Sequence, residues 1–246
     1  MRLENKTAIV TGAASGFGAG IARRFAAEGA QVMVADINAD AAAALAAEIG
    51  GVPCAVDVAN DASVTAMTEA AIAQWGRIDI LVNNAGITHL PKPMEEVSED
   101  EFDRVLAVNA KSVFLTARHI VPLMKQAGGG AILNVASTAG VSPRPNLNWY
   151  NASKGWMITA TKAMAVELAP RGIRVNAINP VAGETPLLKS FMGEDTPEIR
   201  AKFLSTIPLG RFSTPEDMAN AALFLCSDEA SMITGVAMEV DGGRCI

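Results

Sequence analysis

The chain alternates short runs of apolar, mostly β-branched residues with longer Ala-rich segments, and this alternation limits the possible folds more than any other feature. Helical periodicity fills most of the intervals between the apolar runs. The runs are almost entirely apolar, as strands are when helices cover both faces of a parallel sheet. We therefore predict an α/β fold with a doubly wound sheet of seven parallel strands, helices on both faces and right-handed crossovers. The predicted strands cover residues 7–11, 31–36, 52–57, 78–83, 131–137, 174–179 and 237–241.

No linker, repeat or low-complexity tract divides the sequence, so residues 1–246 are predicted to form a single domain. The least regular stretch covers residues 183–207, where Pro186, Gly193 and Pro197 interrupt the pattern. In open α/β sheets, ligands bind beyond the carboxyl ends of the strands. Because this stretch follows the sixth predicted strand, we predict that it forms a lid over a bound molecule.

Composition and charge exclude several classes of partner. The 246 residues include 26 acidic and 20 basic side chains, so the net charge is −6 and no nucleic-acid-binding surface is expected. The three cysteines have no C-x-x-C spacing, which predicts neither a disulfide framework nor a metal site. No signal-peptide core is recognisable, and no apolar stretch approaches the roughly 20 residues that span a bilayer. We expect a cytoplasmic protein without a membrane partner.

A glycine-rich loop, Thr11-Gly12-Ala13-Ala14-Ser15-Gly16-Phe17-Gly18, follows the first predicted strand and leads into a helix. Its glycines allow a tight turn and a close approach of backbone N–H groups to a pyrophosphate, and the helix N-terminus adds partial positive charge. The spacing G-x-x-x-G-x-G differs from the common G-x-G-x-x-G, and an ordinary glycine-rich turn is the alternative. The residues predicted to contact a dinucleotide here are Gly12, Ser15, Gly16, Phe17 and Gly18.

Asp36 ends the second predicted strand and lies 20 residues after Gly16. At about this distance from the loop, an acidic residue accepts hydrogen bonds from the adenosine ribose of a dinucleotide. A carboxylate would repel a 2′-phosphate, and no Arg or Lys occupies positions 13–15, 37 or 38 to compensate. NAD is therefore predicted in preference to NADP, and the alternative is that Asp36 caps the helix beginning near Asn38.

Two further segments follow strands at the same sheet edge. Asp57 and Val58 come after the third predicted strand, and Asn83-Asn84-Ala85-Gly86 comes after the fourth. Small and amide side chains there can hold the adenine and pack beneath the cofactor backbone. The residues predicted to contact the cofactor are Asp57, Val58, Asn84, Ala85 and Gly86, and each segment can also be a simple turn.

Tyr150 is the only tyrosine in the chain, and Lys154 follows it by one helical turn. A phenol has a pKa of about 10, but a fixed ammonium group and a bound nicotinamide cation both favour the phenolate. Tyr150 is thus a candidate proton donor to a ketone or proton acceptor from an alcohol. A solvated Lys beside a packed Tyr is the alternative.

Two polar residues complete this constellation. Ser137 ends the fifth predicted strand, where its hydroxyl can stabilise charge on a substrate oxygen or merely cap a strand. Asn109 lies in an otherwise helical segment, where an amide is a poor helix former. We predict that Asn109 either stabilises a kink or holds a water near Lys154.

Taken in order, these motifs resemble those of the classical, single-domain branch of the short-chain dehydrogenase/reductase family. The resemblance covers essentially the whole chain and rests on T-G-x-x-x-G-x-G at 11–18, N-N-A-G at 83–86, Asn109, Ser137, Y-x-x-x-K at 150–154, Asn179-Pro180 and D-G-G at 241–243. It implies a Rossmann-type fold, NAD bound across the carboxyl edge of the sheet, and hydride transfer between the nicotinamide and a carbinol or carbonyl carbon. It also implies that Tyr150 is the general acid/base, Lys154 lowers its pKa and binds the nicotinamide ribose, Ser137 polarises the substrate oxygen and Asn109 positions a relay water.

The sequence departs from the family pattern after the sixth strand. Members usually have Pro-Gly there, whereas this chain has Asn179-Pro180-Val181-Ala182-Gly183-Glu184-Thr185, which moves the glycine by two further positions. The hydroxyl of Thr185 can bind the nicotinamide amide or a phosphate. The cofactor contacts predicted in this segment are Pro180, Ala182, Gly183 and Thr185, in addition to Tyr150 and Lys154.

The predicted substrate wall is largely uncharged, which favours a small or medium secondary alcohol or ketone, including cyclic ones, polyols and sugars, over a highly charged metabolite. The residues predicted to face the substrate are Gly140, Val141, Leu147, Trp149, Val181, Ala182, Phe191 and Met192, with Asn146, Asn148 and His89 as polar contributors. The main prediction is an NAD(H)-dependent secondary-alcohol dehydrogenase or ketoreductase.

Three other functions compete with this one. A 3-oxoacyl-(acyl-carrier-protein) reductase is disfavoured by Gly128-Gly129-Gly130-Ala131, where related reductases often have a basic residue, although Arg171 keeps it open. A non-catalytic NAD-binding sensor is disfavoured by the intact Ser137, Tyr150 and Lys154. An epimerase of the extended branch would need a larger C-terminal domain.

The resemblance also implies a homotetramer, built partly through the long helices on either side of the fifth strand. A flat helix-to-helix contact is predicted at Ala152, Met157, Ala160, Met164 and Ala165, although a core face within one chain explains these residues nearly as well. Arg244-Cys245-Ile246 is a candidate to reach a neighbouring subunit.

Overall fold

Seven parallel strands form one sheet in the order β3-β2-β1-β4-β5-β6-β7 in the computed structural model, which describes residues 1–246. Every neighbouring pair is parallel, which confirms the predicted sheet. The strands are β1 (Thr7–Thr11), β2 (Gln31–Asp36), β3 (Val52–Ala55), β4 (Ile80–Asn83), β5 (Gly130–Val135), β6 (Ile173–Pro180) and β7 (Ala237–Val240). From β1 the chain adds β2 and β3 on one side, and it then returns to add β4 on the other side. The carboxyl ends of β1 and β4 therefore border the crevice in which such sheets bind ligands.

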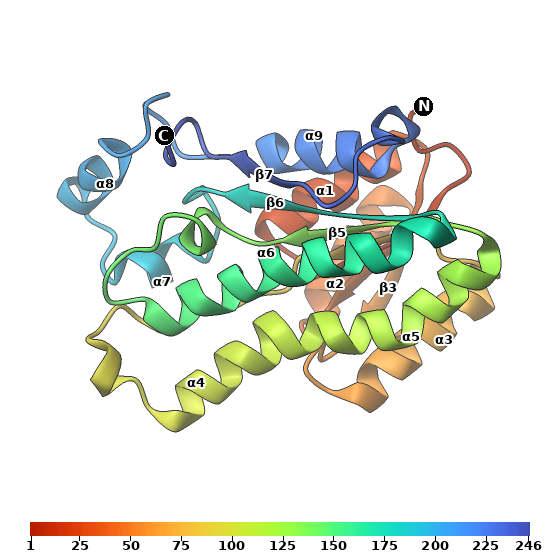
Figure 1. The fold of residues 1–246 in the computed structure, drawn as a ribbon, viewed down its shortest axis with the longest axis horizontal. Helices are drawn as coiled ribbons and strands as arrows, with labels where there is room; N and C mark the ends of the chain where they lie inside the picture. The colour runs from red at the N-terminus through yellow and green to blue at the C-terminus, as the bar shows by residue number, and fades with distance from the viewer.

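Helices cover both faces of the sheet (Figure 1). Helices α1, α2 and α9 supply buried side chains to one core layer, and α3, α5 and α6 supply them to the other. The helices are α1 (Gly16–Ala27), α2 (Ala39–Ile49), α3 (Asp61–Trp75), α4 (Glu99–Leu106), α5 (Ser112–Ala127), α6 (Asn148–Leu168), α7 (Leu188–Met192), α8 (Pro197–Leu204) and α9 (Pro215–Cys226).

The central strand β1 explains why the strand sequences are apolar throughout. Ala8 and Val10 point into the core layer with α1 and α9, whereas Ile9 points into the layer with α3 and α5. Successive side chains of a strand point to opposite faces, so both sets are buried and neither can be polar without a partner. The carboxyl ends of the strands are thereby held rigidly, and the functional loops begin from them.

Helix α3 illustrates how local sequence sets the helix boundaries. Its N-cap Asn60 accepts a hydrogen bond from the Ser63 backbone N–H at 3.0 Å, and the helix stops at Gly76, which has a φ of 73°. The amide oxygen satisfies one of the first-turn N–H groups that have no partner within the helix. Gly76 adopts the left-handed conformation that other residues avoid.

Replacing Asn60 with Ala is expected to cost about 1 kcal/mol of stability because this capping bond is lost. For a chain of this size, that loss lowers the Tm by about 2–4 °C. Thermal unfolding followed by circular dichroism measures the change, and Asn60→Asp, which keeps a cap acceptor, should unfold close to the original temperature. An equal loss in both variants would contradict a capping role.

Residues 183–207 contain more regular structure than the sequence predicts, because α7 and α8 both lie within them. A small apolar cluster connects this segment to the residues on either side of it, and it comprises Val181, Leu188, Met192, Ile207 and Phe212. The sequence showed only the interrupting residues Pro186, Gly193 and Pro197. Pro197 is in fact the first residue of α8, a position at which proline is favoured.

The outward face of α6 differs from the predicted helix contact. Met157 and Ala165 are buried inside the chain's own core, so they are not available to a neighbouring subunit. The exposed side chains that share one face of the helix are Ala152, Trp156, Thr159, Ala163 and Val166. Their spacing of three or four residues places them in one stripe. None of the helices combines the length and apolar character required to cross a membrane.

Candidate active site

The glycine-rich loop connects β1 to α1 at the crevice. Gly12 and Gly16 have φ values of 61° and 54°, which only glycine adopts readily. A Cβ at Gly18 would lie 2.2 Å from the carbonyl oxygen of Gly12, so a side chain at that position cannot fit. Ser15 is the N-cap of α1 but makes no side-chain cap bond, and the first turn contains no acidic residue. The positive end of α1 is therefore available to an anion.

Asp36 lies at the end of β2, and backbone groups hold its carboxylate in place. One oxygen accepts a hydrogen bond from the Ala14 N–H at 2.9 Å, and the other accepts one from the Asn38 N–H at 2.9 Å. The N-cap of α2 is Asn38 and not Asp36, which argues against the capping alternative. Each carboxylate oxygen keeps further acceptor capacity, so Asp36 can also bind ribose hydroxyls.

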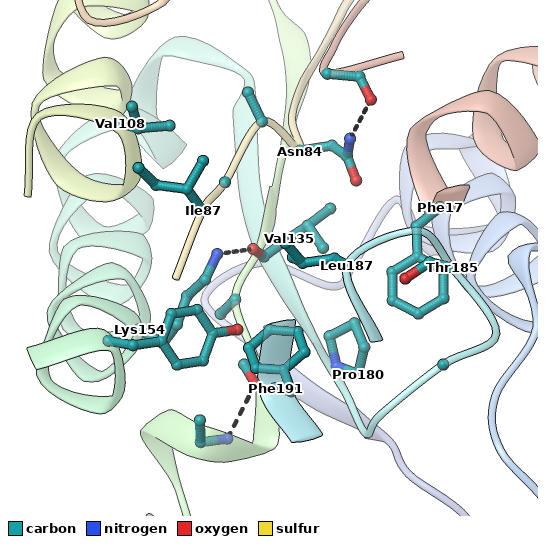
Figure 2. A pocket seen from close by; sticks show the side chains of 18 of the residues that line it. Phe17, Asn84, Ile87, Val108, Val135, Lys154, Pro180, Thr185, Leu187 and Phe191 are labelled. Atoms are coloured by element: carbon teal, nitrogen blue, oxygen red, sulfur yellow. Dashed lines mark hydrogen bonds between the residues drawn. The ribbon is translucent and has the colours of Figure 1, made fainter. Parts of the chain in front are cut away.

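Asn84 has a structural role that the sequence does not predict. Its side-chain Nδ2 donates to the carbonyl oxygens of Thr11 and Gly12 at 2.8 and 2.9 Å, which joins the end of β4 to the glycine-rich loop (Figure 2). Both amide hydrogens are thus used within the protein. Asn84 uses these donors to shape the loop, and its predicted contact with the cofactor stays a prediction, because the residue also lines the cavity.

Tyr150 and Lys154 both lie on the first turns of α6 and are buried, with 5% and 4% of their surface exposed. The Lys154 Nζ donates to the Val135 carbonyl oxygen at 2.9 Å and lies 5.9 Å from the centre of the Tyr150 ring (Figure 2). Ser137, two residues beyond the end of β5, accepts a hydrogen bond from the Ala139 N–H through its Oγ at 3.0 Å. The three predicted catalytic side chains therefore meet at the carboxyl end of β5.

Burial dominates the ionisation of this pair. It raises the pKa of Tyr150 to about 12, and the hydrogen bond with Ser137 offsets only part of that rise. Burial also lowers the pKa of Lys154 to about 8, so the amine is still mostly protonated near neutral pH. The Lys154 ammonium group donates to the Val135 carbonyl, and the lowering of the Tyr150 pKa that the sequence predicts from Lys154 and a bound nicotinamide together stays a prediction.

Asn109 lies in a π-helical segment, Ala107–Lys111, between α4 and α5, and is completely buried. Its Nδ2 donates to the Ile87 carbonyl and to the Ser153 hydroxyl, both at 2.9 Å, and its Oδ1 accepts from the Ile87 N–H at 2.9 Å. The side chain thus joins the loop after β4 to α6 at a break in helical geometry, which agrees with the kink-stabilising alternative. The Oδ1 atom and the Lys154 Nζ both lie close to Gly86. A Cβ at Gly86 would be 3.4 Å from the Oδ1 and 3.3 Å from the Nζ.

A cavity of about 750 Å³ connects these groups. It runs from Asp36 and Asp57, at the ends of β2 and β3, to Ser137 and Tyr150 and then to residues of α7 and α8. The predicted residues that line it are Gly12, Ser15, Phe17, Asp36, Asp57, Val58, Asn84, Ala85, Gly86, Ser137, Leu147, Tyr150, Lys154, Pro180, Val181, Ala182, Gly183, Thr185 and Phe191. Gly16, Gly18 and Asn109 do not line it, although they shape its walls.

The displaced glycine after β6 has a packing reason. A Cβ at Gly183 would lie 2.3 Å from the ring of Phe17, so this side chain of the glycine-rich loop occupies the space that a side chain at position 183 would need. Thr185 packs against Gly16, with its Cβ 3.3 Å from the position that a Gly16 side chain would take. Phe17 and Thr185 both line this end of the cavity (Figure 2). Thr185 therefore does reach the predicted phosphate-binding loop.

Four residues predicted to face the substrate do not line the cavity. Gly140 packs against α6, where a Cβ would lie 2.8 Å from the Gly155 nitrogen, and Val141 is turned to solvent. Trp149 stacks edge-on against Phe102, with ring centres 5.4 Å apart. Met192 is buried in the apolar cluster beside α7. The periodicity that places residues on a helix does not reveal which way a loop or a short helix turns.

The polar contributors are also placed elsewhere. The His89 Nδ1 is 2.8 Å from the Leu90 carbonyl, the Asn148 amide contacts the Met94 sulfur, and Asn146 has a φ of 65°. The cavity wall instead includes residues that the sequence did not single out, namely Ile87, Arg104, Ala107, Val108, Thr138, Ala139, Arg144, Asn151, Leu187 and Phe203. Of these residues, only Arg144 had a sequence feature that could have drawn attention to it, because it is a basic residue in the loop between Ser137 and Tyr150.

Comparisons with known proteins agree with this architecture. The family model described as enoyl-(acyl carrier protein) reductase matches residues 12–244. The chain is 54% identical to the 4-formylbenzenesulfonate dehydrogenase of Comamonas testosteroni and 43% identical to the D-threitol dehydrogenase of Mycolicibacterium smegmatis, with 100% of this chain and 100% and 95% of those proteins covered. The crystal structure of a 3-ketoacyl-(acyl-carrier-protein) reductase from Brucella melitensis, complexed with NADH, superposes with a TM-score of 0.95 at 52% identity, covering 99% of this chain and 100% of that one.

Proposed function

The chain belongs to the classical short-chain dehydrogenase/reductase family, and from this premise we propose that it is an NAD(H)-dependent oxidoreductase that interconverts a small or medium secondary alcohol and its ketone. One observation carries the proposal. Ser137, Tyr150 and Lys154 line the same cavity as Asp36, with the glycine-rich loop between them. A proton-transferring group and a dinucleotide-binding groove are thereby parts of one site.

The residues of the groove fit NAD. Asp36 offers a fixed carboxylate to the adenosine ribose, and the glycine-rich loop offers the positive end of α1 to the pyrophosphate. Asp57 and Val58 border the adenine end, and Pro180, Ala182, Gly183 and Thr185 border the nicotinamide end. When bound, NAD supplies the hydride chemistry, and the protein supplies binding, orientation and the proton.

Tyr150 holds or accepts the proton that moves with the substrate oxygen. In oxidation its phenolate takes the hydroxyl proton of the alcohol, and in reduction its phenol returns a proton to the new alkoxide. The Ser137 Oγ already accepts a bond from the Ala139 N–H, so its own hydrogen can be donated to the substrate oxygen. Lys154 supplies a buried positive charge, and Asn109 can hold a relay water beside it.

The direct test is the absorbance of NADH formed when the protein is mixed with NAD and a panel of secondary alcohols, including cyclic alcohols and polyols. We expect NADH formation with at least one member and NADH consumption in the reverse direction with the matching ketone. Tight NADH binding without turnover of any alcohol or ketone would instead support a non-catalytic sensor.

Replacing Asp36 with Asn is expected to lower the ratio of kcat/KM for NAD over NADP by about 10- to 100-fold. The amide keeps an acceptor for only one of the two backbone N–H groups, and it removes the charge that repels a 2′-phosphate. Steady-state kinetics with both cofactors measures the ratio. Asp40→Asn, an exposed change on α2, serves as the control and should leave the ratio unchanged. If Asp36→Asn did not alter the preference, this carboxylate would not set cofactor choice.

A 3-oxoacyl-(acyl-carrier-protein) reductase is the second candidate. The reductase from Brucella melitensis carries that name, and Arg171 is exposed at the end of α6, where an acidic carrier protein could reach it. The three glycines at 128–130 provide no basic side chain beside it. Activity with an acyl-carrier-protein substrate far above that with free alcohols and ketones would favour this function.

We also propose a homotetramer in which the exposed stripe of α6, Ala152 to Val166, meets a neighbouring subunit. Trp156 is 44% exposed and Val166 81% exposed, which is unusual for apolar side chains on a long helix. Light scattering after size-exclusion chromatography tests this assembly. The cytoplasmic location and a role of residues 244–246 at a subunit contact stay predictions.

A further inference from the structure

Arg144 is the positive group at the substrate end of the cavity. It belongs to the loop between Ser137 and α6, lines the cavity with Leu147 and Tyr150, and is half-buried. Its guanidinium carbon lies 4.2 Å above the centre of the Phe203 ring, which α8 supplies. Its backbone carbonyl accepts a hydrogen bond from the Asn151 amide at 2.7 Å. Contacts on both sides of the cavity therefore fix this arginine in place.

The guanidinium group of Arg144 has no anionic partner within the chain. None of the ion pairs includes it, and it donates no hydrogen bond to another residue. Burial and the neighbouring Arg244 together lower the pKa of Arg144 to about 10, so it remains protonated near neutral pH. Arg244, near the C-terminus, donates to the Ser142 hydroxyl at 3.3 Å. This contact brings a second positive charge to the loop that contains Arg144. A partly desolvated cation beside another cation is costly unless an anion joins them.

The distribution of charge along the cavity places that anion on the substrate. Five charged side chains line the cavity, namely Asp36, Asp57, Arg104, Arg144 and Lys154. Both carboxylates lie at the ends of β2 and β3, where backbone N–H groups hold them at the adenosine end of the groove. The opposite end has only positive groups, and of the two arginines Arg104 is exposed to solvent, where a charge pair contributes little.

Phe203 contacts the guanidinium group, and further apolar side chains line the same cavity. Phe203 lies beneath it, Leu147 lies on the same loop, and Phe191 packs against the Tyr150 ring with centres 5.1 Å apart. A ligand in this part of the cavity would place an apolar body against these rings. An arginine at the edge of an apolar pocket commonly binds an oxyanion such as a carboxylate or sulfonate through two parallel, bidentate hydrogen bonds.

We propose that Arg144 is a substrate-specificity residue that binds an anionic group, and that the natural substrates are alcohols or ketones carrying a carboxylate or sulfonate on an apolar body. This inference rests on the function proposed above and narrows its substrate class. It replaces the expectation, drawn from the sequence, of an uncharged substrate wall. The oxidation itself is unchanged: the carbinol hydrogen leaves with its bonding electron pair as a hydride to NAD, the hydroxyl proton goes to Tyr150, and the distant anion is not consumed.

A purely structural role is the rival interpretation. Through Phe203, Arg144 connects the loop before α6 to α8, so it could act only by holding the segment at 183–207 in place. That role would affect every substrate equally. Anion binding would affect only charged substrates, and mainly through KM.

The experiment compares secondary aryl alcohols that differ only in the para substituent, which is a carboxylate, a sulfonate or a neutral carboxamide of similar size. A second set pairs a straight-chain hydroxy acid with its amide. For the wild type we expect kcat/KM to be at least about 10-fold higher for the anionic member of a pair. The carboxylate and sulfonate arms then show which of the two groups the site prefers.

Arg144→Gln is expected to lower the ratio of anionic to neutral kcat/KM by about 10- to 100-fold, through a higher KM, with little change for the carboxamides. Arg144→Lys should restore part of the preference because it restores the charge without the planar geometry. Arg118→Gln removes the same charge from an exposed position on α5 that does not line the cavity, and it should leave the ratio unchanged. Thermal unfolding of each variant verifies that it is folded.

A binding arm makes the test independent of turnover. The fluorescence of NADH bound to the protein reports the binding of the alcohols para-(1-hydroxyethyl)benzoate, para-(1-hydroxyethyl)benzenesulfonate and the matching neutral amide, which form dead-end complexes because NADH cannot oxidise them. We expect tighter binding of the anionic alcohols to the wild type and loss of that difference in Arg144→Gln.

Three results would overturn the inference: equal kcat/KM for anionic and neutral members, an equal loss for all substrates in Arg144→Gln, or a preference that Arg104→Gln abolishes and Arg144→Gln does not. In each case, oxidation of the neutral alcohols by the wild type would leave the proposed dehydrogenase function standing. If no alcohol or ketone of either kind reacted, the dehydrogenase function itself would be wrong.

Discussion

Replacing Tyr150 with Phe is expected to reduce kcat by a factor of about 100 to 10,000, the usual contribution of a positioned acid or base. The change removes one oxygen atom from a buried ring that packs against Phe191, so the cavity keeps its shape. Without the phenol, no group beside Ser137 can take the hydroxyl proton of the alcohol. The affinity for NADH, measured by fluorescence titration, should change little, since the ring itself remains.

Because Tyr150 is the only tyrosine, its ionisation can be followed directly by tyrosinate absorbance. In the free protein the titration should occur far above the ordinary range, since burial raises the pKa to about 12. Bound NAD carries a positive nicotinamide ring and should lower that pKa, whereas NADH should not. The alcohol oxidation rate should accordingly rise with pH in the wild type.

Two results would contradict this assignment. The first is a Tyr150→Phe variant that retains most of its activity, and the second is a phenol titration that NAD does not move. Trp75→Phe is the control, since it alters an aromatic side chain that does not line the cavity, and it should leave kcat unchanged.

The second large effect is expected for Lys154→Met, which should reduce kcat by about 100- to 1,000-fold. The estimate follows from the loss of a buried positive charge that would otherwise lower the phenol pKa by two or three units once the cofactor is bound. The variant should also bind NAD less tightly if Lys154 contacts the nicotinamide ribose. Steady-state kinetics and NADH titration separate these two consequences.

The same substitution should change how stability depends on pH. The pKa of Lys154 is about 8 in the folded protein against an ordinary value of 10.5, so between these values the unfolded chain binds more protons. Stability therefore rises as the pH increases through this window, by up to about 3 kcal/mol from this group. In Lys154→Met this rise of stability with pH should be absent. The variant also removes the hydrogen-bond donor to the Val135 carbonyl.

Lys162→Met is the matched control for both measurements. Lys162 lies on the same helix two turns further along and is exposed, so its removal should alter neither kcat nor the pH dependence. A pH profile of urea unfolding that is identical in wild type and Lys154→Met would show that the amine is not buried in the folded protein. Unchanged turnover would remove Lys154 from the proposed mechanism.

Short-range signals predicted the glycine-rich loop, the Tyr150–Lys154 pair and the position of Asp36 well. Each depends on residue spacing within one strand, one turn or one helix, and the sheet then brings the strand ends together. The predictions failed where direction mattered. Trp149 and Met192 belong to correctly expected helical or loop segments, yet they pack against Phe102 and the α7 cluster instead of the cavity.

Asn84 shows a second limit of local sequence signals. An amide at a strand end is equally suited to a ligand or to a neighbouring loop, and only the approach of β1 to β4 decided that it binds the carbonyls of Thr11 and Gly12. Arg144 was missed for a related reason. Its neighbours Phe203 and Arg244 are far away along the chain, so neither its burial nor its lack of an anionic partner can be read from the local sequence.

The sequence by itself determined the order of strands and helices, the single parallel sheet and the residue types at its carboxyl edge, because hydrophobic periodicity and glycine spacing act over a few residues. The tertiary structure alone decided which side chains face the cavity, that Tyr150 and Lys154 are buried deeply enough to shift their pKa values in opposite directions, and that positive charge gathers at the substrate end. Those properties depend on desolvation and on charges brought together from distant segments, and neither exists until the chain has folded.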